Sequence, residues 1–119
     1  MKQIVITVII FLSAISCKQE NPIEIKLDCI HEAITINPED ALPMLDSIDT
    51  RQLTSSKLRA KHSLLYSVAL DRNYIDITTD SIITPALKYY SHRGSPDGQC
   101  ATYYYAARIY ENAGTLKKQ

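Results

Sequence analysis

Apolar residues along most of this chain recur at the spacing of an α-helix, and the alternation typical of a β-strand is scarce. From residue 23 onward the first such stripe falls on one helix face, at positions i, i+4, i+7 and i+11. Its members are Ile23, Leu27, Ile30 and Ile34. We expect this helix to end near Ile36, because the residue before Pro38 is pushed out of the helical region.

A second helix follows, with apolar positions at Ala41, Leu42, Leu45 and Ile48. Two starts are open, with either Pro38 as the first helical residue or Asp40 as the N-cap. We favour Asp40, because this start places Pro43 in the first turn, where its missing N–H is harmless. A start at Pro38 would put Pro43 inside the helix, at a cost of about 3 kcal/mol.

The third helix is longer, and we expect Thr54 or Ser55 to cap its start and Asp71 or Arg72 to end it. Its apolar positions are Leu58, Leu65 and Ala69 on one line, with Leu64 and Val68 beside them. After a loop over residues 73–79, Asp80 is the expected N-cap of a fourth helix.

The fourth helix is expected to stop at Gly94. Its apolar positions are Ile82, Ile83, Ala86, Leu87 and Tyr90. Pro85 stands early in this segment, so we expect a bend or a late start there.

A fifth helix follows the turn at residues 95–98 and is expected to reach about Asn112. Gly114 then occupies the position where a left-handed residue closes a helix. The helices therefore form antiparallel pairs with short connections, and the step between pairs is close to 40 residues, judged from Leu65 to Tyr105. Steps of 34 to 47 residues are typical of helical solenoids, so we predict an all-α fold.

The first 16 residues have the layout of an export signal, with basic Lys2 and then an apolar or small run from Ile4 to Ile15. The run has about a dozen residues, whereas a helix that crosses a bilayer needs roughly 20, so a cleaved signal peptide is favoured over a permanent span. An ordinary secretory signal followed by a chance cysteine is the alternative.

The end of this run, L-S-A-I-S-C, resembles the bacterial lipobox with Cys17 as the first mature residue. Ala14 stands where leucine is usual, as in the looser form of the box in Bacteroidetes lipoproteins. The resemblance implies that Cys17 is lipidated and anchors the chain in the cell envelope, where we expect the outer membrane. Residues 17–22 then form a short polar tether, and residues 23–119 form the folded domain.

Removing residues 1–16 takes away one of the 13 basic residues, Lys2, and leaves 12 basic against 13 acidic residues on 103 residues. This length suffices for one small domain, and no basic field indicates a nucleic-acid partner. Cys29 and Cys100 lie in a compartment that permits disulfides, but we expect them to be two buried thiols rather than a bridge.

The segment Ala101 to Gly114, A-T-Y-Y-Y-A-A-R-I-Y-E-N-A-G, resembles the first helix of a tetratricopeptide repeat. The positions that carry the resemblance are Tyr103, Ala106, Ala107, Tyr110 and Gly114. The resemblance implies that these residues pack between hairpins and that Gly114 allows the turn. In the family, further repeats follow, and residues 115–119 look like the beginning of a sixth helix, so we expect the chain to end inside a repeat.

The whole chain also resembles the N-terminal region of tetratricopeptide-repeat lipoproteins of Bacteroidetes. Segments that carry this likeness are D-A-L-P-M-L-D-S-I-D, A-L-D-R-N-Y-I-D and K-Y-Y-S-H-R-G. The implied fold is an array of antiparallel helical hairpins stacked as a solenoid, and the implied role is protein interaction or scaffolding.

Residues typical of catalysis or metal binding do not form a pattern in this sequence. His31, His62 and His92 stand far apart, and no motif of a hydrolase, a P-loop or a dinucleotide site occurs. We therefore predict no enzyme activity, no metal and no cofactor.

The 8 tyrosines are the compositional oddity of the chain. Most of them are expected to pack between hairpins, and Tyr104 or Tyr105 are the candidates for contact with a protein or peptide partner. Two other functions stay open, namely a glycan- or nutrient-binding envelope lipoprotein and the sensor part of a longer regulatory protein. A rise in melting temperature with glycans would favour the glycan- or nutrient-binding function. Continuation of the reading frame into a membrane span and a DNA-binding region would favour the sensor function.

Overall fold

The computed structural model describes residues 21–118 and shows an all-helical fold, with no strand in this range. The predicted signal peptide, the lipidation site Cys17 and most of the tether lie outside the described residues. The helices are α2 (Pro22–Ile36), α3 (Pro38–Asp46), the short 3-10 helix η1 (Thr50–Gln52), α4 (Ser56–Arg72), α5 (Thr84–Tyr90) and α6 (Pro96–Lys118). Within this range, no helix is both long enough and apolar enough to span a bilayer.

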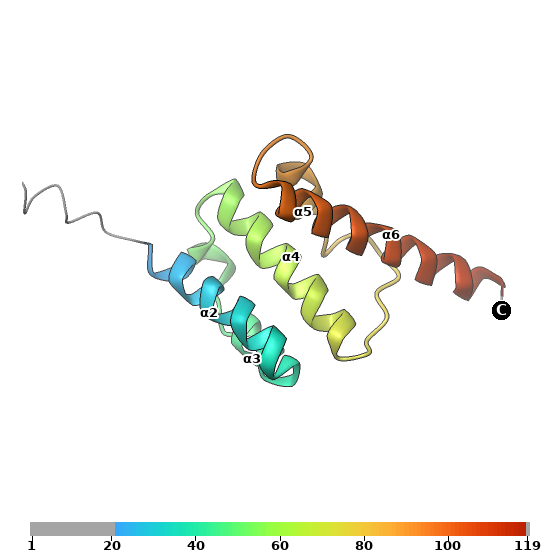
Figure 1. Cartoon of the computed structure of the whole chain (residues 1–119), viewed down its shortest axis with the longest axis horizontal. Helices are drawn as coiled ribbons and strands as arrows, with labels where there is room; N and C mark the ends of the chain where they lie inside the picture. Colours follow the sequence, from blue (N-terminus) through green and yellow to red (C-terminus); the bar gives the residue numbers. More distant parts are fainter. Residues whose placement is uncertain (1–20, 119) are drawn as a thin grey trace, which may run out of the picture.

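Helix α4 lies at the centre of the fold and contacts α2, α3, α5 and α6. In Figure 1, α2, α4 and α6 lie one after another across the molecule and run in the same general direction, with α5 on the far side. Helices α2 and α3 pack on each other, as do α5 and α6. Two helix pairs, α2 with α3 and α5 with α6, are thus arranged around α4.

Two apolar clusters form the core, one on each side of α4. The first contains the stripes predicted for the first three helices, and its central members Leu27, Ile30 and Leu45 are fully buried. The second lies between α4, α5 and α6 and is built on Ile83, Ala86, Ala106 and Ile109. The helical periodicity of the sequence therefore predicted the buried face of the first three helices correctly.

Helix α3 begins at Pro38, so the prediction of Asp40 as its N-cap is wrong. Pro38 suits the first helical position, since the N–H that it lacks has no partner there. The side-chain amide of Asn73 donates to the carbonyl of Pro38 at 2.9 Å, which fixes this turn to the end of α4. Pro43 lies inside the helix, and burial of Ala41 and Leu45 offsets the hydrogen bond lost there.

The end points predicted for α4 are confirmed. Ser55 is the N-cap and accepts a hydrogen bond from the backbone N–H of Leu58 at 3.1 Å, and the helix ends at Arg72. Beyond it, the N–H groups of Tyr74 and Ile75 bond to the carbonyls of Asp71 and Leu70, which is the Schellman pattern. Tyr74 has φ +60°, a left-handed conformation that usually requires glycine.

Helix α5 starts late, as Pro85 predicted, but Asp80 is not its N-cap. The helix begins at Thr84, and its N-cap residue Ile83 makes no side-chain capping bond. Asp80 instead offers its carbonyl, which accepts from both the N–H and the hydroxyl of Thr84. The helix also ends at Tyr90 rather than at Gly94, and Gly94 adopts φ +89° in the turn that follows.

The predicted end of the fifth helix is wrong, because α6 runs through Gly114 to Lys118. Among the described glycines, Gly94 is the one with a positive φ, so Gly114 does not close a turn. Residues 115–118 continue α6 instead of beginning a sixth helix.

The buried stripe of α6 is shifted by one position from the expected one. Thr102, Ala106 and Ile109 are buried, whereas Tyr103 and Tyr110 are 53% and 59% exposed and Ala107 is exposed. The inward face is set by α4 and α5, which cover Ala106 and Ile109 and leave the two tyrosines outside. The predicted packing of Tyr103, Ala107 and Tyr110 is therefore wrong for the described residues, while Ala106 is buried.

Cys29 and Cys100 are both exposed and free, so the prediction of two buried thiols is wrong. Cys29 lies two residues after Leu27, which belongs to the buried stripe of α2. Residues two positions apart do not share a helix face, so Cys29 points away from the core. His31 and His92 are exposed, and His62 is half-buried.

Candidate binding groove

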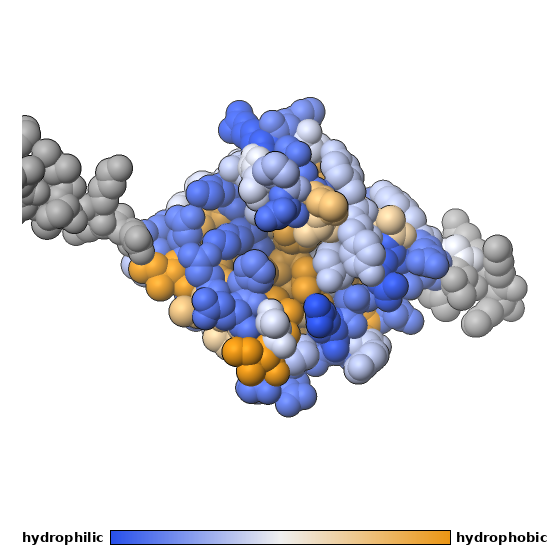
Figure 2. All heavy atoms as spheres, in the orientation of Figure 1, coloured by the Kyte–Doolittle hydropathy of each residue, from blue (hydrophilic) through white to orange (hydrophobic). Residues whose placement is uncertain are grey.

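A groove of ≈ 810 Å³ follows α4 between α2 and α6. We call it the α4 groove, and it has an α2 wall, an α4 floor and a wall formed by the end of α5 and the start of α6. Figure 2 shows apolar residues exposed at the centre of this face, over α4, with hydrophilic residues around them. Four helices, α2, α4, α5 and α6, therefore contribute to one concave surface.

Two ion pairs fix the α2 wall to the floor. Glu24 of α2 binds Lys57 of α4 at 3.1 Å, and one helical turn further along Asp28 binds Lys61. The hydrogen bond that the Lys57 ammonium donates to Glu24 raises the pKa of Lys57. Because each helix contributes residues four apart, the two pairs lie in the same register along α2 and α4.

The floor of the groove is apolar. Leu64, Leu65 and Val68 line it from α4. Leu65 belongs to the first core cluster, and Leu64 packs against the second. The groove floor is thus the outer surface of both cores, so its shape depends on their packing.

The opposite wall depends on a close approach between Tyr90 and two glycines. A Cβ atom on Gly98 would lie 2.6 Å from Cε1 of Tyr90, and one on Gly94 would lie 2.7 Å from Cδ1 of the same ring. Burial in this wall raises the pKa of Tyr90. Ser95 caps α6 beside it by accepting from the N–H of Gly98 at 3.1 Å.

The tyrosines predicted to contact a partner are not part of the α4 groove. Tyr104 is 56% exposed on α6, and Tyr105 packs against the second core cluster, with its ring 5.0 Å from that of Tyr104 in an edge-to-face arrangement. The groove uses Tyr89 and Tyr90 instead. The pair of glycines four residues apart, Gly94 and Gly98, is the sequence signal that would have indicated them.

The α4 groove combines an apolar floor with polar edges. Leu64, Leu65 and Val68 form the floor, and two lysines, two acidic residues and two tyrosines also line the groove. Within residues 21–118, no three His, Cys, Asp or Glu side chains come together as metal ligands. Comparisons with models of protein families, with curated proteins and with solved structures find no match for this chain.

Proposed function

We propose that this protein is an envelope-anchored lipoprotein that binds a protein or peptide partner in the α4 groove, as a tetratricopeptide-like interaction or scaffold module. The observation that carries the proposal is the groove itself, which α2, α4 and α6 form together over an apolar floor. An extended segment laid along it would contact three helices at once.

The spacing of these helices supports a repeat architecture. Helices α2, α4 and α6 begin at residues 22, 56 and 96, so the two steps are 56 − 22 = 34 and 96 − 56 = 40 residues. Both fall in the range of helical repeats, and the second is longer because of the loop between α4 and α5. The α2–α4 ion pairs and the α4–α6 contacts would then join neighbouring repeats.

The anchor is proposed from the sequence of residues 1–17. The apolar run and the lipobox-like L-S-A-I-S-C lead to Cys17, whose thiol would carry the lipid. Asn21, where the described structure begins, is four residues from Cys17, so the binding module would be held close to the membrane.

A peptide-display selection on the chain from residue 17 onward tests the groove. All core residues lie between Leu27 and Ile109, so this chain contains the whole described fold. We expect selected peptides to lose at least about ten-fold in affinity, or about 1.4 kcal/mol, with Ala101→Gln, which places a long side chain at the groove wall.

The matched control is Ala107→Gln, which makes the same substitution at an exposed position of α6 away from the groove. It should bind the selected peptides as the wild type does. A selection without enriched peptides, or peptides that bind both variants equally well, would contradict the proposal.

A further inference from the structure

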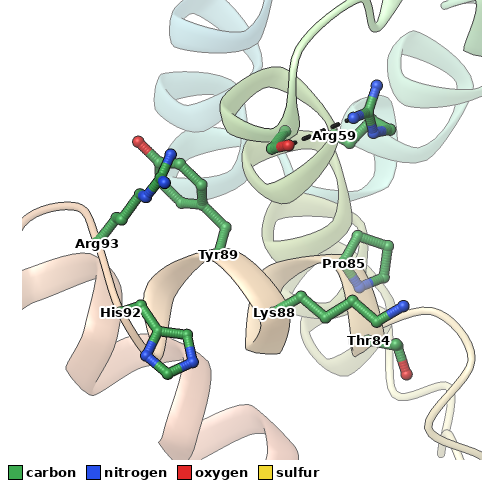
Figure 3. A pocket seen from close by; sticks show the side chains of 8 residues that line it. Arg59, Thr84, Pro85, Lys88, Tyr89, His92 and Arg93 are labelled. Carbon is green, nitrogen blue, oxygen red and sulfur yellow. Dashed lines mark hydrogen bonds between the residues drawn. The ribbon is translucent and has the colours of Figure 1, made fainter.

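A second pocket, of ≈ 590 Å³, opens between the first turn of α4 and the length of α5 with the turn that follows it. Arg59 reaches it from α4, while Lys88, His92 and Arg93 project from α5 and the turn that follows (Figure 3). No Asp or Glu among the described residues lines it. We call this the basic pocket.

The charges of the basic pocket are not neutralised by neighbours. The ion pairs of the described residues engage Arg51, Lys57, Lys61 and Arg108, and they do not include Arg59, Lys88 or Arg93. Arg59 donates to the carbonyl of Leu53 at 3.0 Å and to the hydroxyl of Ser56 at 3.4 Å, and both acceptors are uncharged. The lining of the pocket therefore carries three full positive charges and one histidine.

This concentration of charge is local. The whole chain has 13 basic and 13 acidic residues, so a basic pocket at one place is not the consequence of a basic composition. Long-range attraction to polyanions in general would need a basic protein, whereas a local cluster acts within about 10 Å, the Debye length at moderate salt.

The basic pocket lies at the end of the fold where the chain enters it. Glu24, three residues after Asn21, binds Lys57, and Lys57 is next to Ser56 in the pocket. Figure 1 shows the beginnings of α2 and α4 at the same end of the molecule. Cys17 is four residues before Asn21, so a fully extended connection spans at most about 14 Å.

We propose that the basic pocket binds the phosphate headgroups of an anionic phospholipid surface and so orients the fold on the membrane. This inference rests on the proposed anchoring at Cys17, which would hold the pocket next to such a surface. Arg59, Lys88 and Arg93 then contact lipid phosphates. The α4 groove shares Tyr89 with the basic pocket, and its other lining residues differ from those of the pocket. Each basic residue near an anionic surface contributes about 1 kcal/mol of attraction, equivalent to about five-fold in binding.

Co-sedimentation of the non-acylated chain with vesicles tests this proposal. The chain begins at residue 17 and carries Cys17→Ser, so a failure of lipidation in the cell cannot influence the result. We expect binding to equimolar phosphatidylcholine and phosphatidylglycerol, little binding to phosphatidylcholine alone, and a decrease with added salt. Arg93→Gln should weaken binding about five-fold, and Lys88→Gln with Arg93→Gln about 25-fold.

Arg72→Gln is the matched control, since it removes the same side chain from an exposed position at the other end of α4. Lys88 and Arg93 are exposed and unpaired, so their variants should keep the helical circular dichroism of the wild type. Equal binding to neutral vesicles, or an equal loss with Arg72→Gln, would overturn the proposal. Saturable binding of inorganic phosphate in the basic pocket without any affinity for the mixed vesicles would also overturn it, in favour of a free anion.

Discussion

The hydroxyl of Ser63 accepts a hydrogen bond from the backbone N–H of Ala86 at 3.2 Å. The same hydroxyl donates to the carbonyl of Ile82, so a side chain of α4 caps the start of α5. Helix α5 has no capping side chain of its own, because Ile83 stands at its N-cap. Ser63 thus provides, from a neighbouring helix, the capping hydrogen bond that a Ser, Thr or Asp at the N-cap position normally provides.

Replacing Ser63 with alanine should lower the free energy of unfolding by about 1–3 kcal/mol, because the buried N–H of Ala86 and the carbonyl of Ile82 lose their partner. Urea denaturation followed by circular dichroism measures this change. Ser91→Ala, at an exposed position just after α5, is the control and should change stability by less than about 0.5 kcal/mol. Similar values for the two variants would show that Ser63 is not the cap of α5.

Two glycines in α6 should respond to alanine with opposite signs. Gly98→Ala must displace the Tyr90 ring, which lies 2.6 Å from the new Cβ, so we expect a loss of about 1–3 kcal/mol. Gly114→Ala meets no atom within 4 Å and should gain about 0.5–1 kcal/mol from the better helix propensity. Thermal unfolding of both variants provides the comparison, and a stabilised Gly98→Ala would contradict the packing described for the groove wall.

Tyr74 is 96% exposed, and its left-handed backbone is strained for a residue with a Cβ. Tyr74→Gly should therefore raise the free energy of unfolding by about 0.5 kcal/mol, after the entropy of glycine in the unfolded chain is subtracted. The same change at Tyr104, inside α6, should instead lower stability by about 0.5 kcal/mol. Chemical denaturation distinguishes the two signs, and destabilisation by both variants would argue against the Schellman turn.

Stability should decrease at alkaline pH because of two tyrosines. The hydroxyl of Tyr66 donates to Asp46 at 2.6 Å, which raises the pKa of Tyr66, and burial raises the pKa of Tyr90. The folded state thus holds these protons more tightly than the unfolded state does. Their contribution is complete below the ordinary tyrosine pKa of about 10 and is lost as the pH rises through the folded-state values.

Tyr66→Phe should reduce this alkaline loss, measured as the difference between the unfolding free energies at neutral pH and above about pH 10. Tyr110→Phe removes an exposed hydroxyl and serves as the control. An alkaline loss that is the same in wild type and Tyr66→Phe would mean that Asp46 does not stabilise the protonated phenol.

Lipidation predicts a particular mass and location for the protein in a Bacteroidetes host. The wild type should appear in the membrane fraction with the mass of residues 17–119 plus acyl chains, and Cys17→Ala should lose both properties. Cys29→Ala, which removes an exposed thiol from α2, should keep them. Wild-type protein that is cleaved but soluble would contradict the proposed lipid anchor at Cys17.

The sequence alone determined the helical class, the buried faces of α2, α3 and α4, and the cap and end of α4. These features depend on the spacing of apolar residues and on local capping chemistry, which a linear pattern records. Leu27, Ile30 and Leu45 are buried as their periodicity predicted, and Ser55 caps its helix through a bond to the third residue after it.

The tertiary structure decided what local rules left undetermined. Asn73 donates a hydrogen bond to the carbonyl of Pro38 and so stabilises the start of α3, although Pro43 lies inside that helix. Ser63 of α4 caps α5. Packing against α4 and α5 buries Ile109 rather than Tyr110. Each of these outcomes depends on a contact between residues more than about 20 positions apart. A helix such as α6 has apolar or aromatic residues on several faces. Which of these faces is buried is determined by the helices that pack against it.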